Sequence, residues 1–130
     1  VDTYNGRKLN LKSNGRSGGT SNLYFDKGKI NYKDLLNSHS RSLYITETIG
    51  HGSNLVTGDY SVGATGFLIE NGEFKYPINE ITIAGNFKEM FQNITLANDL
   101  EIEYSTNSPT MMIEGKIVAG KWINLFNFFK

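Results

Sequence analysis

The chain contains no cysteine, only two prolines and no net charge, with 13 Lys and Arg balancing 13 Asp and Glu over 130 residues. Without cysteine it cannot hold a disulfide framework, a thiolate metal site or a cysteine nucleophile, and it suits a reducing cytoplasm. The balanced charge does not indicate a strongly basic nucleic-acid binder. Its longest apolar-rich run, residues 122–129, is far shorter than the roughly 20 residues of a transmembrane helix. These absences predict one cytoplasmic domain that does not enter a membrane.

Glycine and asparagine are abundant instead. The 14 Gly and 15 Asn predict a chain that turns often, and a hydrophobic content of 38% is enough for a packed core. Charge is uneven, because residues 1–42 carry eight Lys or Arg against three Asp or Glu, whereas residues 43–130 carry five against ten. Residues 13–22, rich in Gly, Ser and Asn, are typical of a long surface loop.

The clearest local unit is a β-hairpin centred on Asn71-Gly72, a pair that accepts the positive φ angles of a type I′ turn. Strand-like runs flank this pair, with Phe74 and Tyr76 on one face. Pro77 cannot donate a ladder hydrogen bond, so its strand should end there or lie at an edge. Alternating or β-branched residues predict further strands at 43–46, 78–84, 100–104 and 110–118, the last broken at Gly115.

Two short helices are predicted. Asn31, followed by Asp34, favours one turn of helix, and Asn86 with Glu89 three residues on resembles a capping box. The second helix should carry one apolar stripe: Phe87, Met90, Phe91 and Ile94. The sequence therefore predicts a mainly β fold of the α+β family, a twisted antiparallel sheet or open barrel with one or two short helices.

Motifs for catalysis and metal binding are missing. His39 and His51 lack the spacing of a zinc site, and neither a nucleophile elbow nor a phosphate-binding glycine loop is present. Glu101 and Glu103 share a predicted strand face and are better explained as a solvated edge than as an acid/base pair. We therefore assign no catalytic residue and no metal ligand.

The unusual stretch is residues 50–61, where a histidine between two glycines is soon followed by Thr-Gly-Asp. Such a pattern fits a loop whose polar side chains bond locally, and it fits equally a loop that approaches a partner or peptide. The candidate contact residues for a partner or peptide are Gly50, His51, Gly52, Thr57, Gly58 and Asp59.

Residues 50–73 read Gly-His-Gly-Ser-Asn-Leu-Val-Thr-Gly-Asp-Tyr-Ser-Val-Gly-Ala-Thr-Gly-Phe-Leu-Ile-Glu-Asn-Gly-Glu, and residues 80–86 read Glu-Ile-Thr-Ile-Ala-Gly-Asn. With the Arg-Lys-Leu start at Arg7 and the Val-Ala-Gly close at Gly120, this pattern resembles the C-terminal domain of the TldD/PmbA family. It is most similar to the PmbA (TldE) branch, and the resemblance covers nearly all of residues 4–121.

The resemblance implies a role in a zinc metallopeptidase complex, from a family once known as modulators of DNA gyrase. In that family a TldD-like subunit supplies zinc through a helical His-Glu-x-x-x-His and a later Cys, which this chain lacks. The resemblance thus implies a non-metal domain, with zinc in a TldD-like partner and a peptide or unfolded protein as substrate. It implies neither nucleic acid nor membrane as a partner, and it allows a homodimer.

Two departures from the family pattern stand out. Its N-terminal part has no counterpart here, so we expect an isolated C-terminal domain over residues 1–121. Residues 122–130 run past the pattern as an apolar extension, which we expect to be a last strand or a subunit contact. The alternatives to the accessory domain are a regulatory binding module and part of a self-sufficient zinc peptidase whose ligands lie upstream.

The basic cluster of Arg7, Lys8, Lys12 and Arg16 generates the first prediction. Because no row of aromatic residues interleaves these cations, we expect no salt-dependent DNA binding. Fluorescence anisotropy with a labelled duplex at two salt concentrations measures this. Affinity that falls steeply with salt would instead favour the regulatory module.

Overall fold

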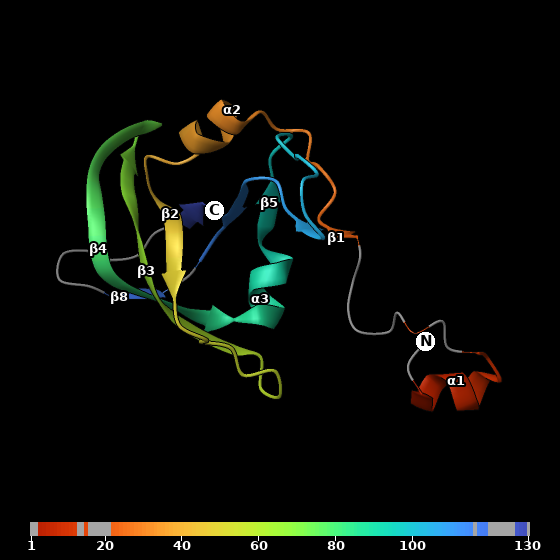
Figure 1. The fold of residues 1–130 in the computed structure, drawn as a ribbon. Coiled ribbons are helices and arrows are strands. Elements are labelled where there is room, and N and C mark those ends of the chain that lie inside the picture. The colour runs from red at the N-terminus through yellow and green to blue at the C-terminus, as the bar shows by residue number, and fades with distance from the viewer. Residues whose placement is uncertain (1–2, 13–14, 16–21, 116, 120–126, 130) are drawn as a thin grey trace.

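The computed structural model describes residues 3–12, 15, 22–115, 117–119 and 127–129. Strands dominate this part of the chain, and seven of them form one twisted sheet in the order β5-β7-β9-β2-β3-β4-β8 (Figure 1). These seven are β2 (Arg41–Ile49), β3 (Asp59–Glu70), β4 (Glu73–Asn86), β5 (Ile94–Leu96), β7 (Met111–Ile113), β8 (Ile117–Ala119) and β9 (Asn127–Phe129). A separate parallel pair joins β1 (Leu23–Tyr24) to β6 (Thr106–Asn107).

The core of the sheet is an antiparallel meander of β2, β3 and β4. Bulges interrupt both pairings, and β9 joins β2 in parallel. The outermost strands, β5 and β8, are not neighbours, so the sheet remains open. The predicted mainly β fold is confirmed in its twisted-sheet form rather than as a barrel.

The hairpin at Asn71-Gly72 is confirmed. Both residues have positive φ, +50° and +79°, and they connect β3 to β4. Beyond the turn, Phe74 packs its ring against Phe67 on β3 and Tyr44 on β2, with ring centroids 5.7 Å and 5.4 Å apart. These cross-strand aromatic contacts align the three central strands at this end of the sheet.

The edge of β4 fits the prediction for Pro77. The strand continues through this residue, which lies opposite Phe67 on β3. On the other side, β8 pairs only with residues 82–84. Pro77 therefore lies on a part of the β4 edge that no described strand covers. A missing N–H donor on that side removes no hydrogen bond of the sheet.

Two hydrophobic clusters occupy opposite faces of the sheet. Leu43 and Ile45 of β2 point into the larger cluster, which Met90 of α3 (Phe87–Gln92) joins. Between them, Tyr44 points to the other face and packs against the smaller cluster, which contains Leu35 of α2 (Tyr32–Asn37). Because alternate residues of a strand face opposite sides, one strand serves both clusters, and each face is covered by one short helix.

Both predicted helix caps are present. The Asn31 side chain accepts a hydrogen bond from the Lys33 amide at 2.9 Å, and that of Asn86 accepts one from Lys88 at 3.0 Å. The apolar stripe on α3 is shorter than predicted, because the helix ends at Gln92 and Ile94 opens β5. A third helix, α1 (Thr3–Leu9), was not predicted, and Figure 1 shows it set apart from the sheet.

The prediction of a strand over residues 100–104 is wrong. This segment forms no strand, and Ile102 and Tyr104 are exposed. The Asn107 side chain instead accepts hydrogen bonds from the amides of Glu103 and Tyr104, at 3.0 Å and 2.9 Å. Alternation of apolar residues indicates that a segment has two different faces, but it does not indicate whether a partner strand is present. Here the Asn107 side chain, close in sequence, accepts the amide hydrogen bonds that a partner strand would have accepted.

The other strand predictions are confirmed. Residues 43–46 and 78–84 lie within β2 and β4, and residues 110–118 divide into β7 and β8 on either side of Gly115. Most of the predicted loop at 13–22 and residues 120–126 lie outside the described residues. Asn127–Phe129 form β9, and the proposed division of the chain at residue 121 stays a prediction. No described helix is long and apolar enough to cross a membrane.

A matched pair of leucine substitutions tests the core. Leu68 is 1% exposed, whereas Leu55 is 89% exposed. We expect Leu68→Ala to lower the free energy of unfolding by about 2–5 kcal/mol, because it removes buried methyl groups and leaves a cavity. Leu55→Ala should change it by less than about 0.5 kcal/mol. Urea unfolding followed by circular dichroism compares the two, and equal losses would contradict this core.

Candidate functional site

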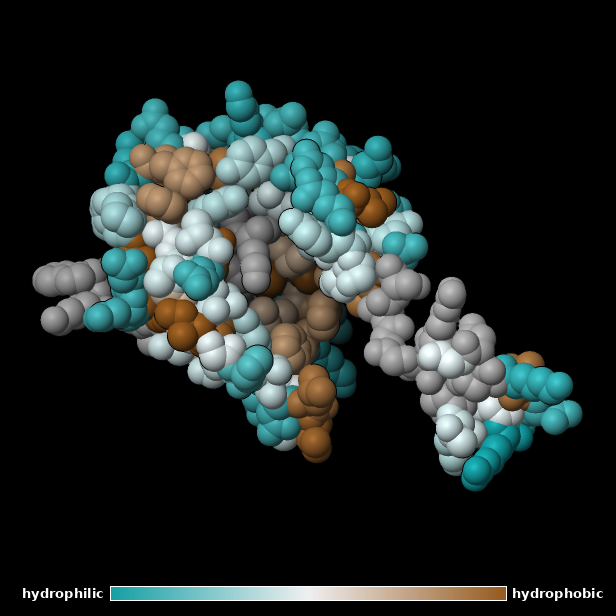
Figure 2. All heavy atoms as spheres, viewed as in Figure 1, coloured by the Kyte–Doolittle hydropathy of each residue, from teal (hydrophilic) through white to brown (hydrophobic). Residues whose placement is uncertain are grey.

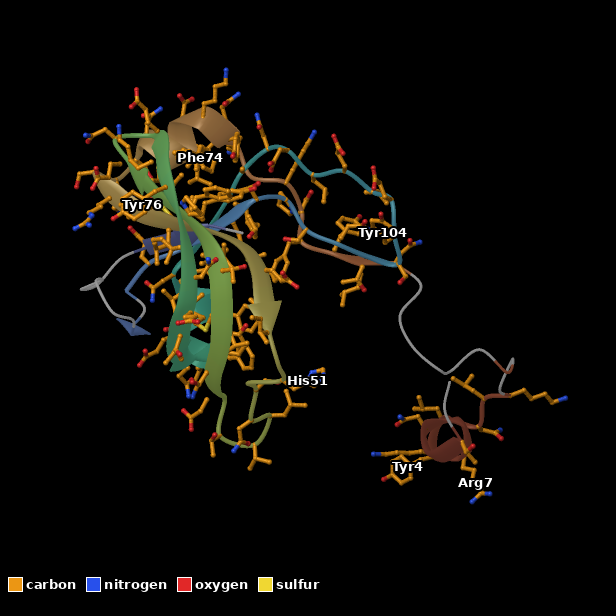
Figure 3. All side chains as sticks on the ribbon, turned by 60° about the vertical axis from the view of Figure 1, so that its left-hand side comes forward. Tyr4, Arg7, His51, Phe74, Tyr76 and Tyr104 are labelled. Carbon is orange, nitrogen blue, oxygen red and sulfur yellow. The ribbon has the colours of Figure 1, made fainter. Side chains whose placement is uncertain are left out.

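The candidate residues lie in a loop that joins β2 to β3, called here the 50–59 loop. It projects beyond one end of the central meander, and Figure 3 shows its His51 at the opposite end of the sheet from Phe74 and Tyr76. Both ends of the loop are anchored in the sheet. The strands that it joins, β2 and β3, pair with each other, and β3 also pairs with β4. A loop anchored in this way can present side chains in a defined orientation.

The base of the loop depends on close approach of two backbone segments. The Ser61 amide donates a 2.8 Å hydrogen bond to the Gly52 carbonyl, and Ser53 forms an isolated bridge with Tyr60. A Cβ atom at Gly52 would lie 1.8 Å from the Ser61 carbonyl oxygen, so only glycine fits there. Gly50 turns the chain out of β2 with a φ of +91°.

The tip of the loop is organised by Asn54. Its side-chain oxygen accepts hydrogen bonds from the amides of Val56 (3.0 Å) and Thr57 (3.3 Å). Its carbonyl accepts the Gly58 amide at 2.8 Å, and its own amide donates to the Asp59 carbonyl at 2.8 Å. These bonds turn the tip back on itself. They leave Leu55 and Val56 at the end of the loop, 89% and 95% exposed.

A polar cluster ties the loop to α3. The Thr57 hydroxyl donates to an Asp59 carboxylate oxygen at 2.7 Å, and the Asn86 amide group donates to the other at 3.1 Å. Asn86 also donates to the Thr57 carbonyl at 3.1 Å while it caps α3, and the Phe87 amide donates to the Gly58 carbonyl at 2.7 Å. The hydrogen bonds from Thr57 and then Asn86 lower the pKa of Asp59. Asp59 is thus held as a carboxylate that positions the loop.

The structure brings together only some of the predicted residues. Thr57, Gly58 and Asp59 meet around Asn86, whereas Gly50 and Gly52 shape the base. His51 is exposed, and no hydrogen bond or ion pair of the described residues joins it to this cluster. Sequence reasoning missed Asn54, Leu55, Val56 and the link to Asn86. Asn54 followed by a turn was a usable signal, but the Asn86 contact spans 27 residues and has no local signature.

An apolar cavity of about 170 Å³ lies beside the loop, between the sheet and α3. Phe25, Tyr60, Phe87, Met90 and Phe91 are among its lining residues. Burial raises the pKa of Tyr60, so its hydroxyl remains protonated. Figure 2 shows a brown hollow in this part of the molecule and brown spheres at the projecting end below it. The cavity offers apolar surface rather than reactive groups.

The remaining candidates have structural roles. His39 lies 2.9 Å from the Ser38 hydroxyl and 3.0 Å from Glu114, a sequence of groups like that of a catalytic triad. However, Ser38 donates its proton to the Leu35 carbonyl at 2.6 Å, at the end of α2, so it is not available as a nucleophile. Across the described residues, no three His, Asp or Glu side chains are grouped closely enough to hold a metal ion.

Comparison with known proteins identifies the family of this mainly β domain. The family model for the PmbA/TldA metallopeptidase C-terminal domain matches residues 1–120. The chain belongs to this PmbA/TldD family.

Its relatives include PmbA proteins. The chain is 41% identical over 122 residues to the metalloprotease PmbA of Escherichia coli O157:H7, covering 93% of this chain and 27% of that protein. It is 43% identical over 122 residues to the metalloprotease PmbA homolog of Buchnera aphidicola subsp. Baizongia pistaciae, covering 92% of this chain and 27% of that protein. The chain thus spans about a quarter of the length of these curated relatives.

A solved structure shares the fold. The crystal structure of a proposed DNA gyrase modulator from Thermotoga maritima superposes with a TM-score of 0.75 at 33% identity. The match covers 91% of this chain and 29% of that one. The family resemblance inferred from the sequence is therefore confirmed.

The Asp59 cluster predicts a pH effect. Because folding lowers the pKa of Asp59, its stabilising contribution is complete above the unfolded-state pKa of about 3.8 and is lost as the pH falls through the lower, folded-state pKa. The difference in stability between wild type and Asp59→Asn should therefore be constant above about pH 5 and shrink below pH 4.

Urea unfolding midpoints at several pH values measure this difference. Thr57→Val, which removes the stronger of the two donors, should raise the pKa of Asp59 in an NMR titration. An unchanged Asp59 titration in this variant would contradict the assigned role of the Thr57 hydroxyl.

Proposed function

We propose that this domain is the non-metal C-terminal domain of a PmbA-like subunit and that its 50–59 loop contacts a TldD-like subunit, which holds the zinc. The assembly would act in the cytoplasm as a peptidase on peptides or unfolded proteins. In this proposal the domain completes a subunit interface and forms one wall of a peptide groove, and it performs no bond cleavage itself.

The observation that carries the proposal is the pair of apolar side chains at the tip of the loop. Leu55 and Val56 are 89% and 95% exposed, although transferring apolar surface out of water is worth roughly 25 cal/mol per Å². The hydrogen bonds of Asn54 already order this tip, so docking would cost little conformational entropy. An ordered and exposed apolar tip is typical of a binding contact.

The edge of β4 supports the peptide part of the proposal. In the described structure β8 covers only residues 82–84, so the outer edge of the strand near Phe74 and Tyr76 carries no neighbouring strand. Phe74 and Tyr76 are 49% and 53% exposed. An extended peptide could add main-chain hydrogen bonds to such an edge and pack its side chains on these rings.

A regulatory module is the second candidate, because the Thermotoga maritima structure is described as a proposed modulator of DNA gyrase. A self-sufficient zinc peptidase is the third. The DNA-binding measurement given above separates the first two. Metal analysis of the full-length protein tests the third, since stoichiometric zinc together with peptidase activity in the lone subunit would overturn the accessory role.

Substitution at the loop tip tests the proposal directly. We expect Leu55→Ser with Val56→Ser to weaken binding to the TldD-like subunit at least tenfold, because both side chains leave an apolar contact. Ile102→Ser is the control, since Ile102 is also apolar and 63% exposed but lies outside the loop. Isothermal titration calorimetry with the full-length subunits measures both. Equal affinities for the loop variant and wild type would contradict the proposal.

A further inference from the structure

Strand β9 lies inside the sheet, between β2 and β7, which do not pair with each other (Figure 1). It runs parallel to β2, with residues 127–129 opposite residues 42–44, and antiparallel to β7, with Phe128 and Phe129 opposite Ile113 and Met112. The space between β2 and β7 is called here the strand slot. A strand of only three residues therefore connects two parts of the sheet.

The walls of the slot and its occupant come from different parts of the chain. The walls, residues 42–44 and 112–113, lie within the 1–120 stretch that matches the family, whereas β9 lies beyond it. The slot thus belongs to the family domain, and the strand that fills it here comes from residues outside the matched stretch.

With β9 in place the walls of the slot are buried: Ser42 and Leu43 are 0% and 1% exposed, and Met112 and Ile113 are 4% and 5% exposed. Removing β9 would expose these apolar side chains to water and take away the strand that pairs with the main chain of both walls. In addition, the Ser42 hydroxyl is buried with no hydrogen-bond partner among the described residues, and Ser42 lies opposite Asn127. The slot therefore requires an extended backbone and offers one further polar group to it.

We propose that the strand slot is a binding site for an extended peptide segment and that residues 127–129 are its resident, intramolecular occupant. Main-chain hydrogen bonds do not depend on which chain supplies the strand, so a peptide can replace β9 by strand complementation. The resident strand competes at the millimolar effective concentration of a tethered segment. A peptide should consequently bind well only when β9 is weakened. This site lies apart from the 50–59 loop and does not depend on the function proposed for it.

Phe128→Pro in the full chain weakens the resident strand, because proline removes a main-chain N–H within the ladder. Phe128→Ala is the matched control, since it changes the same side chain and keeps the N–H. The probe is the synthetic peptide Asn-Leu-Phe-Asn-Phe-Phe-Lys, with the sequence of residues 124–130. The same peptide with proline at its second-last phenylalanine is the control ligand.

We expect the peptide to bind Phe128→Pro at least tenfold more tightly than wild type or Phe128→Ala, and the proline peptide not to bind. Hydrogen exchange should show renewed protection of amides in residues 42–44 and 112–113 when the peptide is added. If Phe128→Pro unfolds and the peptide restores folding, the proposal is likewise supported. A folded variant that does not bind the peptide, or an unfolded one that the peptide does not rescue, overturns it. Neither result bears on the loop-tip variants.

Discussion

In the β3–β4 pair, Asp59 lies opposite Asn86 at one end and Glu70 lies opposite Glu73 at the other. This register decides where both ends of the meander are placed. At the first end it brings the Asp59 carboxylate within 3.1 Å of the Asn86 amide group, so that one residue both caps α3 and anchors the 50–59 loop. A one-residue slip of the pair would reverse the faces of every β4 side chain and separate these two groups.

The consequence for function is that the polar residues of the loop hold its shape while the apolar ones remain available for contact. The Thr57 hydroxyl and the Asp59 carboxylate are occupied by bonds within the molecule, whereas Leu55 and Val56 project into solvent. A catalytic group must reach a substrate with its proton or lone pair free, which these residues do not offer. The arrangement suits recognition, which is the role proposed for this loop.

The sheet is also completed by short extended segments around its long central strands. β8 covers only three residues of the β4 edge, and β9 fills the strand slot with three residues. An extended peptide can add to a sheet edge of this kind, because its main chain can supply the hydrogen bonds of a neighbouring strand. The chain spans 27% of its curated relative, and the open edge of β4 and the strand slot are places where we propose that other polypeptide joins the sheet.

Local features could be predicted from the sequence because their hydrogen bonds close within a few residues. The caps at Asn31 and Asn86 and the turn at Asn71-Gly72 are of this kind, and the family could be inferred from the motif at 50–73. Contacts between segments distant in sequence were decided only by the tertiary structure. The tertiary structure places Asn86 against Thr57 and Asp59, and it inserts β9 between β2 and β7. Residues 100–104 form no strand within it. Periodicity reports which side of a strand is apolar, but the choice of neighbour depends on the packing of the whole chain.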